Sequence, residues 1–441
     1  MKPSAPADPD VLLARAQAAF TAGDDEIALA LVGPALAQRP DWPPALLLQA
    51  NASLRCGDLD IGINALQKLC QRGPVPAALA RALATAHNNR GSQRRRAGDE
   101  AAALQDFEAA LVLQPGHALA GFNRGLCLCA LGRRSEAEQA LAAHLRAWPQ
   151  DLEAALEHAL LTPETPARRE RLQQLLATAN PAQPVPAGLE ARVHLALQQP
   201  EAALTALQHA PQDARAALAW SLGEALQMDN LSEAAAQAFA LGGTQARARE
   251  RLAAAIVCRP VQTSAETALA ERERSLAALE ALTLECANGA PLDASRLEDL
   301  ALSHFLLAYQ GQDDTTLMAK LGSLVAHTAR TLHPGWADPP EARHPRRVLL
   351  VGSLFRDCTA GAYFGGWIGW LREAGLEVVV YQLGPRRDAE TGRLAGLANR
   401  FHFVEEDTAL DALAAQLHAQ SAGLLLYPEL GMGARLYPLA A

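Results

Sequence analysis

A cysteine stands between an apolar, strand-like run and a helix in "LLVGSLFRDCTAGAYFGGWIGWL" (residues 349–371). Loops that follow strands are where α/β proteins place their chemistry. The thiolate is the nucleophilic form of cysteine, and a nearby cation or a helix N-terminus favours it by lowering the thiol pKa. Arg356 and the helix after Cys358 offer both, so one interpretation of Cys358 is a reactive thiol. The alternative is a small apolar residue buried in the loop.

Other polar side chains have spacings that suit binding. Asn89 and Asn123 stand at equivalent positions of two consecutive expected helix pairs. A side-chain amide both donates to and accepts from a peptide backbone, so a row of asparagines can hold an extended peptide without reading its side chains. The alternative is a coincidence on a solvated face. Asp388 follows the second expected strand and either orients an acceptor or a water, or caps the next helix.

The composition excludes several classes of protein. The 441 residues carry a formal net charge of -9, which argues against a nucleic-acid binder. Seven cysteines without a CxxC pair, and no HExxH, predict neither a disulfide framework nor a metal site. The N-terminus lacks the apolar core of a signal peptide, and no apolar stretch is long enough to span a bilayer. We therefore expect a cytoplasmic protein without a membrane partner.

A repeat organises the first third of the chain. Four glycines each precede a proline by the same interval, in the pairs Gly23 and Pro40, Gly57 and Pro74, Gly98 and Pro115, and Gly132 and Pro149. The prolines recur with the tetratricopeptide period, apart from a seven-residue insertion ahead of the third unit. The glycine opens the turn between two antiparallel helices, and the proline ends the pair. We predict tetratricopeptide repeats over residues 8–150.

Helices are expected to continue beyond the repeats. Residues 151–250 are typical of degenerate repeats that cap a stack, with a further helix pair in "ARAALAWSLGEALQMDNLSEAAAQAFALGG". Residues 251–335 form a helical connecting region, with a long amphipathic helix in "TALAERERSLAALEALTLE" and two helices joined at "GQDD" within residues 297–332. The proline-rich segment 333–347 indicates a domain boundary.

Residues 345–441 alternate between strands and helices. The expected strands are "RVLLVG", "EVVVYQLG", "RFHFV" and "GLLLYP". This series predicts a Rossmann-like lobe with a parallel sheet and right-handed crossovers. A ligand site is expected at the carboxyl ends of the strands, over residues 353–362, 384–388 and 427–433. The glycine patterns of dinucleotide and P-loop sites are absent from the sequence.

Tetratricopeptide units followed by these α/β segments resemble the SPINDLY-like, protein O-GlcNAc transferase-like glycosyltransferases. The resemblance lies in "RRVLLVGSLFRDCTAGAYFGGWI", "EVVVYQLGPRRDAETGRLAGLANRF" and "LLLYPELGMGARLYPLAA", with "RPVQTSAETALAERERSLAALEAL" in the helical region. It implies that the lobe is the N-terminal half of a GT-B fold and forms the acceptor side of its cleft. Complete relatives transfer a sugar from a nucleotide donor to serine or threonine of proteins.

The resemblance also assigns site residues. Cys358 in "RDCTAG" stands where the family commonly has the histidine of R-x-H-T-x-G, and Arg400 in "ANRF" stands at the histidine of A-[DN]-H-F. A thiol cannot replace imidazole as a proton acceptor near pH 7. Asp388 matches the family's loop aspartate, which completes the three catalytic candidates. The acceptor-side cleft is expected to be lined by Arg356, Thr359, Tyr363, Tyr427 and Met432. The alternative for the two tyrosines and the methionine is a place in the core.

Family members continue into a second lobe that binds the nucleotide-sugar, whereas this sequence ends at Ala441. We therefore expect a glycosyltransferase-like protein that is inactive alone. It should bind no cofactor, and a UDP-GlcNAc-type donor only if the other lobe is supplied. The expected partners are proteins or peptides along the repeat groove, with a homodimer as one assembly. The alternative is a non-catalytic tetratricopeptide scaffold for protein–protein interaction.

Overall fold

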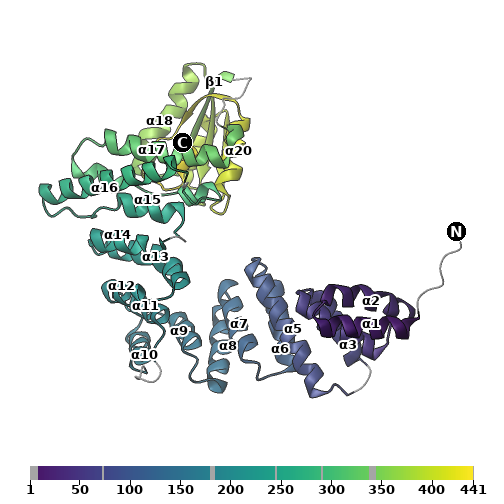
Figure 1. The fold of residues 1–441 in the computed structure, drawn as a ribbon. Coiled ribbons are helices and arrows are strands. Elements are labelled where there is room, and N and C mark those ends of the chain that lie inside the picture. The colour runs from purple at the N-terminus through teal and green to yellow at the C-terminus, as the bar shows by residue number, and fades with distance from the viewer. Residues whose placement is uncertain are drawn as a thin grey trace. The chain divides into compact units, whose positions relative to one another are not determined.

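The computed structural model describes residues 8–71, 74–178, 184–243, 246–289, 292–336 and 344–440. The chain divides into two compact units, Met1–Pro184 and Val185–Ala441 (Figure 1). Residues 337–343, in the middle of the segment 333–347 predicted as a domain boundary, lie outside the described ranges. No helix within these ranges is long and apolar enough to cross a membrane.

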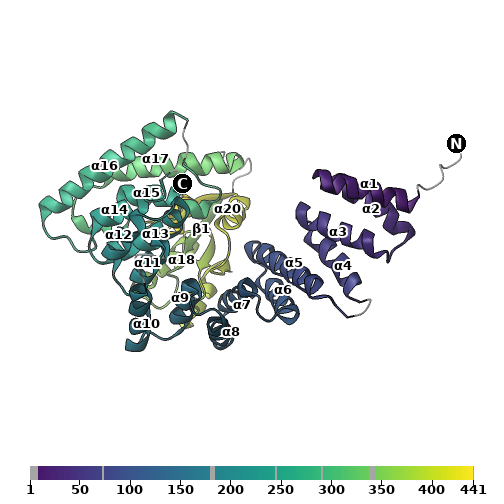
Figure 2. The same ribbon diagram turned by 60° about the horizontal axis from the view of Figure 1, so that its bottom comes forward.

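The first unit is built from helices in antiparallel pairs. They are α1 (Pro9–Ala22), α2 (Asp25–Gln38), α3 (Pro43–Cys56), α4 (Leu59–Cys70), α5 (Ala77–Arg96), α6 (Glu100–Leu113), α7 (Ala118–Ala130), α8 (Arg134–Ala147), α9 (Leu152–Leu161) and α10 (Pro166–Ala177). The glycine predicted at each of the first four turns has a left-handed φ between 70° and 92°. Each pair packs on the next through α2 and α3, α4 and α5, and α6 and α7 (Figures 1 and 2). The tetratricopeptide-like repeat is confirmed.

The two helices of a pair approach each other so closely that one position has no room for a side chain. A Cβ atom on Gly91 would lie 2.8 Å from the ring of Phe107 on the second helix of the pair. A Cβ atom on Gly125 would lie 2.5 Å from Leu141 in the next pair. The two residues of each contact have the same separation along the chain, so this is one contact repeated.

The predicted seven-residue insertion lengthens a helix rather than a loop. Helix α5 has 20 residues, whereas α1 and α3 have 14 each and α7 has 13. The extra residues precede the repeated part and begin at Ala77, so α5 extends by about two turns, or roughly 10 Å. The buried Leu83 anchors this extension in the core of the first two pairs.

The second unit begins with helices and ends with an α/β lobe. Its longer helices are α11 (Ala187–Ala196), α12 (Pro200–Gln208), α13 (Gln212–Met228), α14 (Ser232–Ala240), α15 (Ala248–Ile256), α16 (Ala265–Ala287) and α17 (Thr315–Leu332). The helix pair predicted from sequence is α13 and α14, where a Cβ atom on Gly223 would lie 2.4 Å from Phe239. These two residues have the same spacing as Gly91 and Phe107, and Asn230 replaces the turn glycine with a φ of 66°. The repeat therefore persists where its glycine signature is lost.

The prediction of a helix over the start of residues 297–332 is wrong. That part of the chain forms two short 3₁₀ helices, η2 (Leu297–Leu300) and η3 (Phe305–Gln310), and a third, η4 (Pro334–Trp336), follows α17. One reason is local, because Asp299 accepts hydrogen bonds from the backbone N–H groups of Ser295 and Arg296 and closes a tight turn. The other is tertiary: the N–H of Leu297 donates to Asp411, and the hydroxyl of Ser303 donates to the carbonyl of Gly431. Leu302 is buried between the two 3₁₀ helices.

The lobe contains the expected parallel sheet. Its elements in chain order are β1 (His344–Gly352), α18 (Thr359–Glu373), β2 (Glu377–Leu383), α19 (Ala389–Leu397), β3 (Arg400–Val404), α20 (Leu410–Ala419), β4 (Ala422–Leu426) and α21 (Leu436–Ala440). The strand order is β3-β2-β1-β4, and Leu349 of β1 pairs with Val379 of β2 and Leu425 of β4. Helices α18 and α19 bury one face, and α20 and α21 bury the other. The doubly wound architecture is confirmed.

One hydrophobic core joins the helical region to the lobe. Leu410 of α20 and Tyr437 of α21 belong to the same buried cluster as Leu321 of α17. Asp411 of α20 accepts a hydrogen bond from the backbone N–H of Leu297 at 3.4 Å and pairs with His333. The segments on either side of the proline-rich stretch therefore stabilise one another.

A buried ionic network fixes α5 against α6. Asp106 is 2% exposed and lies 2.6 Å from Nη2 of Arg90, 2.9 Å from Nη1 of Arg94 and 3.0 Å from Nδ1 of His87. Burial disfavours its charge, but the hydrogen bonds from His87 and Arg90 and the arginine charges hold the pKa of Asp106 below its ordinary value of 3.8. Nη1 of Arg90 also reaches Asp60 of α4 at 2.6 Å. The network therefore links three helices.

We predict that Asp106→Asn lowers the free energy of opening of α5 and α6 by about 3 kcal/mol, because it removes the buried carboxylate that pairs with the partly buried Arg90 and Arg94. Native-state hydrogen exchange of these two helices measures the change. The matched control is Asp60→Asn, whose side chain is 80% exposed and whose effect should stay within about 0.5 kcal/mol.

Because the pKa of Asp106 is lowered on folding, the contribution of its charge is present above pH 3.8 and is lost as the pH falls through the lowered pKa. In this acidic range, the free energy of opening of α5 and α6 should fall more steeply with pH in the wild type than in Asp106→Asn. Equal effects of the two substitutions would contradict the network's role.

Candidate functional site

The loops after β1 and β4 meet at the carboxyl edge of the sheet, where the strand order reverses. Glu429, in the loop after β4, accepts hydrogen bonds from the backbone N–H and, at 3.2 Å, the hydroxyl of Ser353 after β1. Gln382 at the end of β2 is fully buried, accepts from the N–H of Phe355 at 3.0 Å and donates to the carbonyl of Ser353 at 2.8 Å. Ligands of doubly wound folds bind at this point of the sheet.

Glu429 is the buried acid of this edge. It is 4% exposed, and burial raises the pKa of its carboxyl although the hydrogen bonds from Ser353 and the charge of Arg356 act in the opposite direction. Sequence reasoning did not single out Glu429 or Gln382. The available signal for Gln382 was one amide at the end of the otherwise apolar "VVVYQL".

The helical region holds the loop after β4 from the other side. The hydroxyl of Ser303 donates to the carbonyl of Gly431 at 3.3 Å, and the ring of His304 packs edge-on against Tyr437 at 4.6 Å. Burial lowers the pKa of His304, which keeps its ring neutral, and its Nδ1 has no hydrogen-bond partner among the described residues. No sequence pattern predicted this contact, because it joins segments far apart in the chain.

Cys358 is the N-cap residue of α18. Its sulfur accepts from the N–H of Gly361 at 3.3 Å and lies 3.5 Å from the carbonyl oxygen of Leu354, to which the thiol donates. The side chain is half-buried. A Cβ atom at Gly361 would lie 2.0 Å from the carbonyl oxygen of Arg356, so the loop closes tightly around the start of the helix. The sulfur thus has a structural role in this turn.

Asp388 is the N-cap residue of α19, and both of its oxygens are engaged. Oδ1 accepts from the N–H of Thr391 at 2.8 Å, and Oδ2 accepts from the N–H of Asp357 at 2.9 Å. These backbone hydrogen bonds, with a smaller contribution from the charge of Arg356, lower the pKa of Asp388. The aspartate ties the loop after β1 to the loop after β2, which is the capping role predicted as one alternative.

Of two further predicted site residues, Arg400 lies away from this edge, and Tyr427 is partly buried against the core of the lobe. Arg400 begins β3 at the amino edge of the sheet, where it pairs with Glu377 at 2.8 Å. Tyr427 donates its hydroxyl to the carbonyl of Leu439 at 2.8 Å, and burial raises its pKa strongly. Arg400 was predicted as a site residue only because it stands at the histidine position of the family's A-[DN]-H-F segment. Tyr427 was predicted because it directly follows the fourth strand. The structure thus places Arg400 at the opposite edge from Cys358 and Asp388, and the packing of Tyr427 agrees with the alternative of a core residue.

The other predicted cleft residues remain accessible at or near the carboxyl edge. Tyr363 is 69% exposed and Met432 is 47% exposed. Thr359 is exposed, and Arg356 is half-buried beside Asp388. These four side chains could contact a ligand placed outside the ends of β1 and β4. No group of three metal-binding side chains occurs among the residues that the structure describes.

The predicted asparagines belong to a larger amide cluster in the first unit. Nδ2 of Asn123 on α7 donates to Oδ1 of Asn88 on α5 at 3.3 Å, and Nδ2 of Asn88 lies 3.4 Å from Oδ1 of Asn89. Asn89 is exposed, Asn123 is half-buried and Asn88 is buried. Sequence reasoning paired Asn89 with Asn123 by register and missed Asn88, whose side chain links them.

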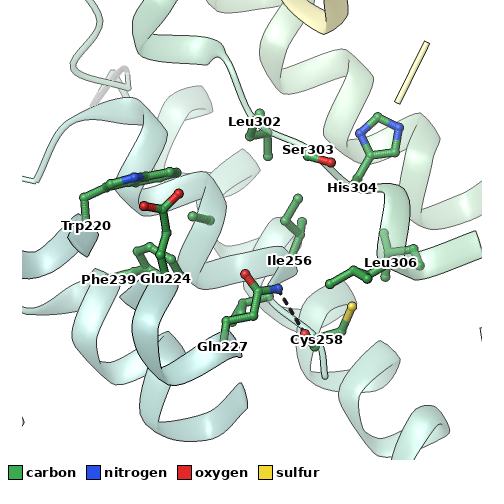
Figure 3. A pocket seen from close by; sticks show the side chains of 13 residues that line it. Trp220, Glu224, Gln227, Phe239, Ile256, Cys258, Leu302, Ser303, His304 and Leu306 are labelled. Atoms are coloured by element: carbon green, nitrogen blue, oxygen red, sulfur yellow. Dashed lines mark hydrogen bonds between the residues drawn. The ribbon is translucent and has the colours of Figure 1, made fainter. Parts of the chain in front are cut away.

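A separate cavity of about 110 Å³ opens in the second unit beside α13 and α15 (Figure 3). Phe239 and Ile256 supply part of its apolar floor, and Glu224 stands on one side. Gln227 donates to the carbonyl of Cys258 at 3.0 Å, and burial raises the pKa of the Cys258 thiol to about 12. This thiol is therefore unreactive at neutral pH, and no residue predicted as part of a site lines the cavity.

Comparisons with known proteins return tetratricopeptide structures at low similarity. No family model matches the chain. No curated protein sequence matches it. Among solved structures, the chain is similar to MamA (19% identity, TM-score 0.30, covering 38% of this chain and 90% of that one). It is also similar to a tetratricopeptide repeat protein from Parabacteroides merdae (17% identity, TM-score 0.38, covering 54% of this chain and 93% of that one). A third similar structure is YrrB, a TPR protein with an unusual peptide-binding site (18% identity, TM-score 0.28, covering 46% of this chain and 92% of that one). The fold assignment rests on the helix pairs themselves.

We predict that Glu429→Gln stabilises the second unit at pH 8. The pKa of Glu429 is raised above its ordinary value of 4.5, so its favourable contribution is full below pH 4.5 and is lost as the pH rises through the raised pKa. Glutamine keeps an acceptor for the N–H of Ser353 without a charge. The melting temperature should rise by about 2–4 °C at pH 8, and the gain should shrink towards pH 4.5.

Thermal unfolding followed by tryptophan fluorescence between pH 4.5 and 8 measures this difference. Glu406→Gln is the matched control, because Glu406 is exposed in a nearby loop and its substitution should leave the profile unchanged. A variant that is less stable than the wild type at pH 8 would show that the ionised carboxylate stabilises the loops.

Proposed function

We propose that the first unit binds extended peptides through the side-chain amides of Asn89 and Asn123, as part of a repeat scaffold for protein interaction. The observation that carries the proposal is the chain of amides Asn123–Asn88–Asn89, which crosses from α7 to α5. Among the described residues, no hydrogen bond engages Oδ1 of Asn123 or Nδ2 of Asn89. One acceptor and one donor thus remain for a peptide backbone.

The ionic network beneath these amides supports the proposal. His87 and Arg90 flank Asn88 and Asn89 on α5, and both bind the buried Asp106 of α6. A helix held in this way cannot turn about its axis when a ligand binds. The amides are therefore pre-organised, which reduces the entropy lost on binding.

The contacts of the catalytic candidates also favour a scaffold over an enzyme. The sulfur of Cys358 and both oxygens of Asp388 are engaged in helix caps and loop contacts. Arg400 pairs with Glu377 at the opposite edge of the sheet. A catalytic group must reach a substrate from a single site, and these three side chains do not share one.

We predict that Asn123→Ala weakens peptide binding by about fivefold to tenfold, the loss of one hydrogen bond at a partly desolvated site. The probes are three unrelated, uncharged 12-residue peptides, each labelled and titrated by fluorescence anisotropy. Because the amides contact only the backbone, the three peptides should bind alike, and N-methylation of their backbones should reduce the affinity.

Asn288→Ala is the matched control, since Asn288 is an exposed asparagine that follows α16 in the other unit. No binding of any peptide, or equal affinity of the wild type and Asn123→Ala, would overturn the proposal.

A second candidate function is that of a glycosyltransferase-like lobe, as the sequence resemblance implies. One observation favours it: Arg356, Tyr363 and Met432 are accessible near the carboxyl edge of the sheet, where the loops after β1 and β4 leave it. In this reading the lobe supplies the acceptor side of a cleft, and a UDP-GlcNAc-type donor binds when a second lobe is present.

Calorimetric titration of UDP, UDP-GlcNAc and GDP-fucose into the purified chain tests whether the lobe holds a donor site of its own, without a second lobe. We predict no measurable heat with any of them, because the carboxyl edge lacks a glycine-rich phosphate cradle and its loops are tied together by Asp388 and Glu429. Micromolar binding of one nucleotide-sugar would favour the enzyme over the scaffold.

A further inference from the structure

A groove of about 230 Å³ lies in the first unit, where the end of α6, the first half of α7 and the second half of α8 meet. Its walls are apolar and come from Leu111, Pro115, Ala140, Ala143 and Ala147. This volume is below the range of about 300–1,000 Å³ that holds drug-sized ligands. It suits a single amino-acid residue.

The polar side chains at the rim of the groove are hydrogen-bond donors. His117 accepts the N–H of Ala120 on Nδ1 at 3.2 Å, so its ring proton is on Nε2. Trp148 is 46% exposed and carries an indole N–H, and Arg124 carries a full positive charge. No aspartate or glutamate is among the described residues that line the groove.

The base of the groove is held in place by a buried histidine. His144 is nearly fully buried, and its Nε2 lies 2.8 Å from Oδ2 of Asp151, so this nitrogen donates to the carboxylate. The other ring nitrogen, Nδ1, lies 3.1 Å from where a Cβ of Gly121 would stand. This histidine therefore shapes the groove, and the groups at the rim are left to bind a ligand.

Arg124 has only a weak partner of its own. Its Nε lies 3.4 Å from Oε1 of Glu108, and both side chains are partly exposed. Exposed pairs of this kind contribute little, so the competition that Glu108 offers to a ligand is small. Among the described residues, the two terminal nitrogens of Arg124 make no hydrogen bond, and they can bind a carboxylate in the bidentate manner.

The groove is independent of the amide cluster. Asn123 contacts Asn88 of α5, whereas the next residue, Arg124, contacts Glu108 of α6. Neighbouring residues of α7 thus project towards different helices. A ligand in the groove lies on the side of α6 and α8, away from the asparagines.

We propose that this groove binds the C-terminal residue of a partner protein when that residue has an apolar side chain. The free carboxylate meets Arg124, with His117 and Trp148 as further donors, and the side chain lies on the apolar walls. Charge complementarity selects this occupant, because a terminal apolar residue joins a carboxylate directly to an apolar group of the right size. An internal peptide segment offers no such carboxylate.

The experiment compares two labelled ten-residue peptides of glycine and serine that end in leucine, one with a free carboxylate and one amidated. Fluorescence anisotropy with the full chain should show that amidation weakens binding by about tenfold or more, since it removes the charge-assisted pair with Arg124. Replacing the terminal leucine by serine should weaken binding to a similar extent.

Two variants locate the site. Arg124→Gln removes the charge, and Ala143→Leu fills the groove from an exposed position without disturbing the core. Each should reduce the affinity for the free-acid peptide by about tenfold. Arg146→Gln is the matched control, because Arg146 is exposed on α8 and does not line the groove.

The inference is overturned if the acid and the amide bind equally, if neither binds at 1 mM, or if Arg124→Gln binds as well as Arg146→Gln does. Circular dichroism confirms that each variant is folded. Asn123→Ala should leave the ratio of the affinities for the free-acid and amidated peptides unchanged, whereas Arg124→Gln should abolish that ratio, so failure here and failure of the amide cluster are distinguished by separate variants.

Discussion

The helical part of this protein depends on one steric constraint, the close approach of the two helices in each pair. At Gly91, Gly125 and Gly223 a Cβ atom would overlap a side chain that stands at the same interval further along the chain. A large side chain on the second helix therefore occupies the space that a small residue leaves on the first. Because these pairs share the same contact, they have nearly the same geometry and stack on their neighbours in the same way. The amide cluster and the groove beside Arg124 both follow from this stacking, since each is formed by helices of adjacent pairs.

Local signals predicted the elements of the fold, and tertiary contacts explain where they failed. Glycine spacing predicted the first four helix pairs, because a left-handed turn and a close approach both require a residue without a Cβ. The same spacing was hidden at Asn230, where an asparagine adopts the left-handed conformation at the turn. Residues 297–310 carry helical propensity, yet contacts with the lobe hold them in short 3₁₀ turns. Helix propensity amounts to a few tenths of a kcal/mol per residue, and tertiary packing outweighs it.

The candidate site could be located from sequence only to the level of an edge of the sheet. Strand order places loops at that edge, so Cys358 and Asp388 were found in the right region. Capping was one of the two roles predicted for Asp388, whereas the capping role of Cys358 was not predicted, because it depends on which backbone N–H groups lie within reach. Glu429 and Ser353 lie in the predicted loops, but the hydrogen bond between them was missed, since they lie far apart in the sequence and no pattern joins them. Cys358 and Asp388, the two catalytic candidates at this edge, are therefore already engaged in polar contacts that hold the loops.

The shared core of the second unit has a consequence for how this protein can be divided. Leu410 and Tyr437 are buried together with Leu321, on the other side of the proline-rich stretch. A module that moves between proteins during evolution has to carry its whole core with it. The α/β lobe does not meet that condition, so recombination at the proline-rich stretch would give two fragments with exposed apolar surfaces. The unit of inheritance is therefore the lobe together with the helices that precede it.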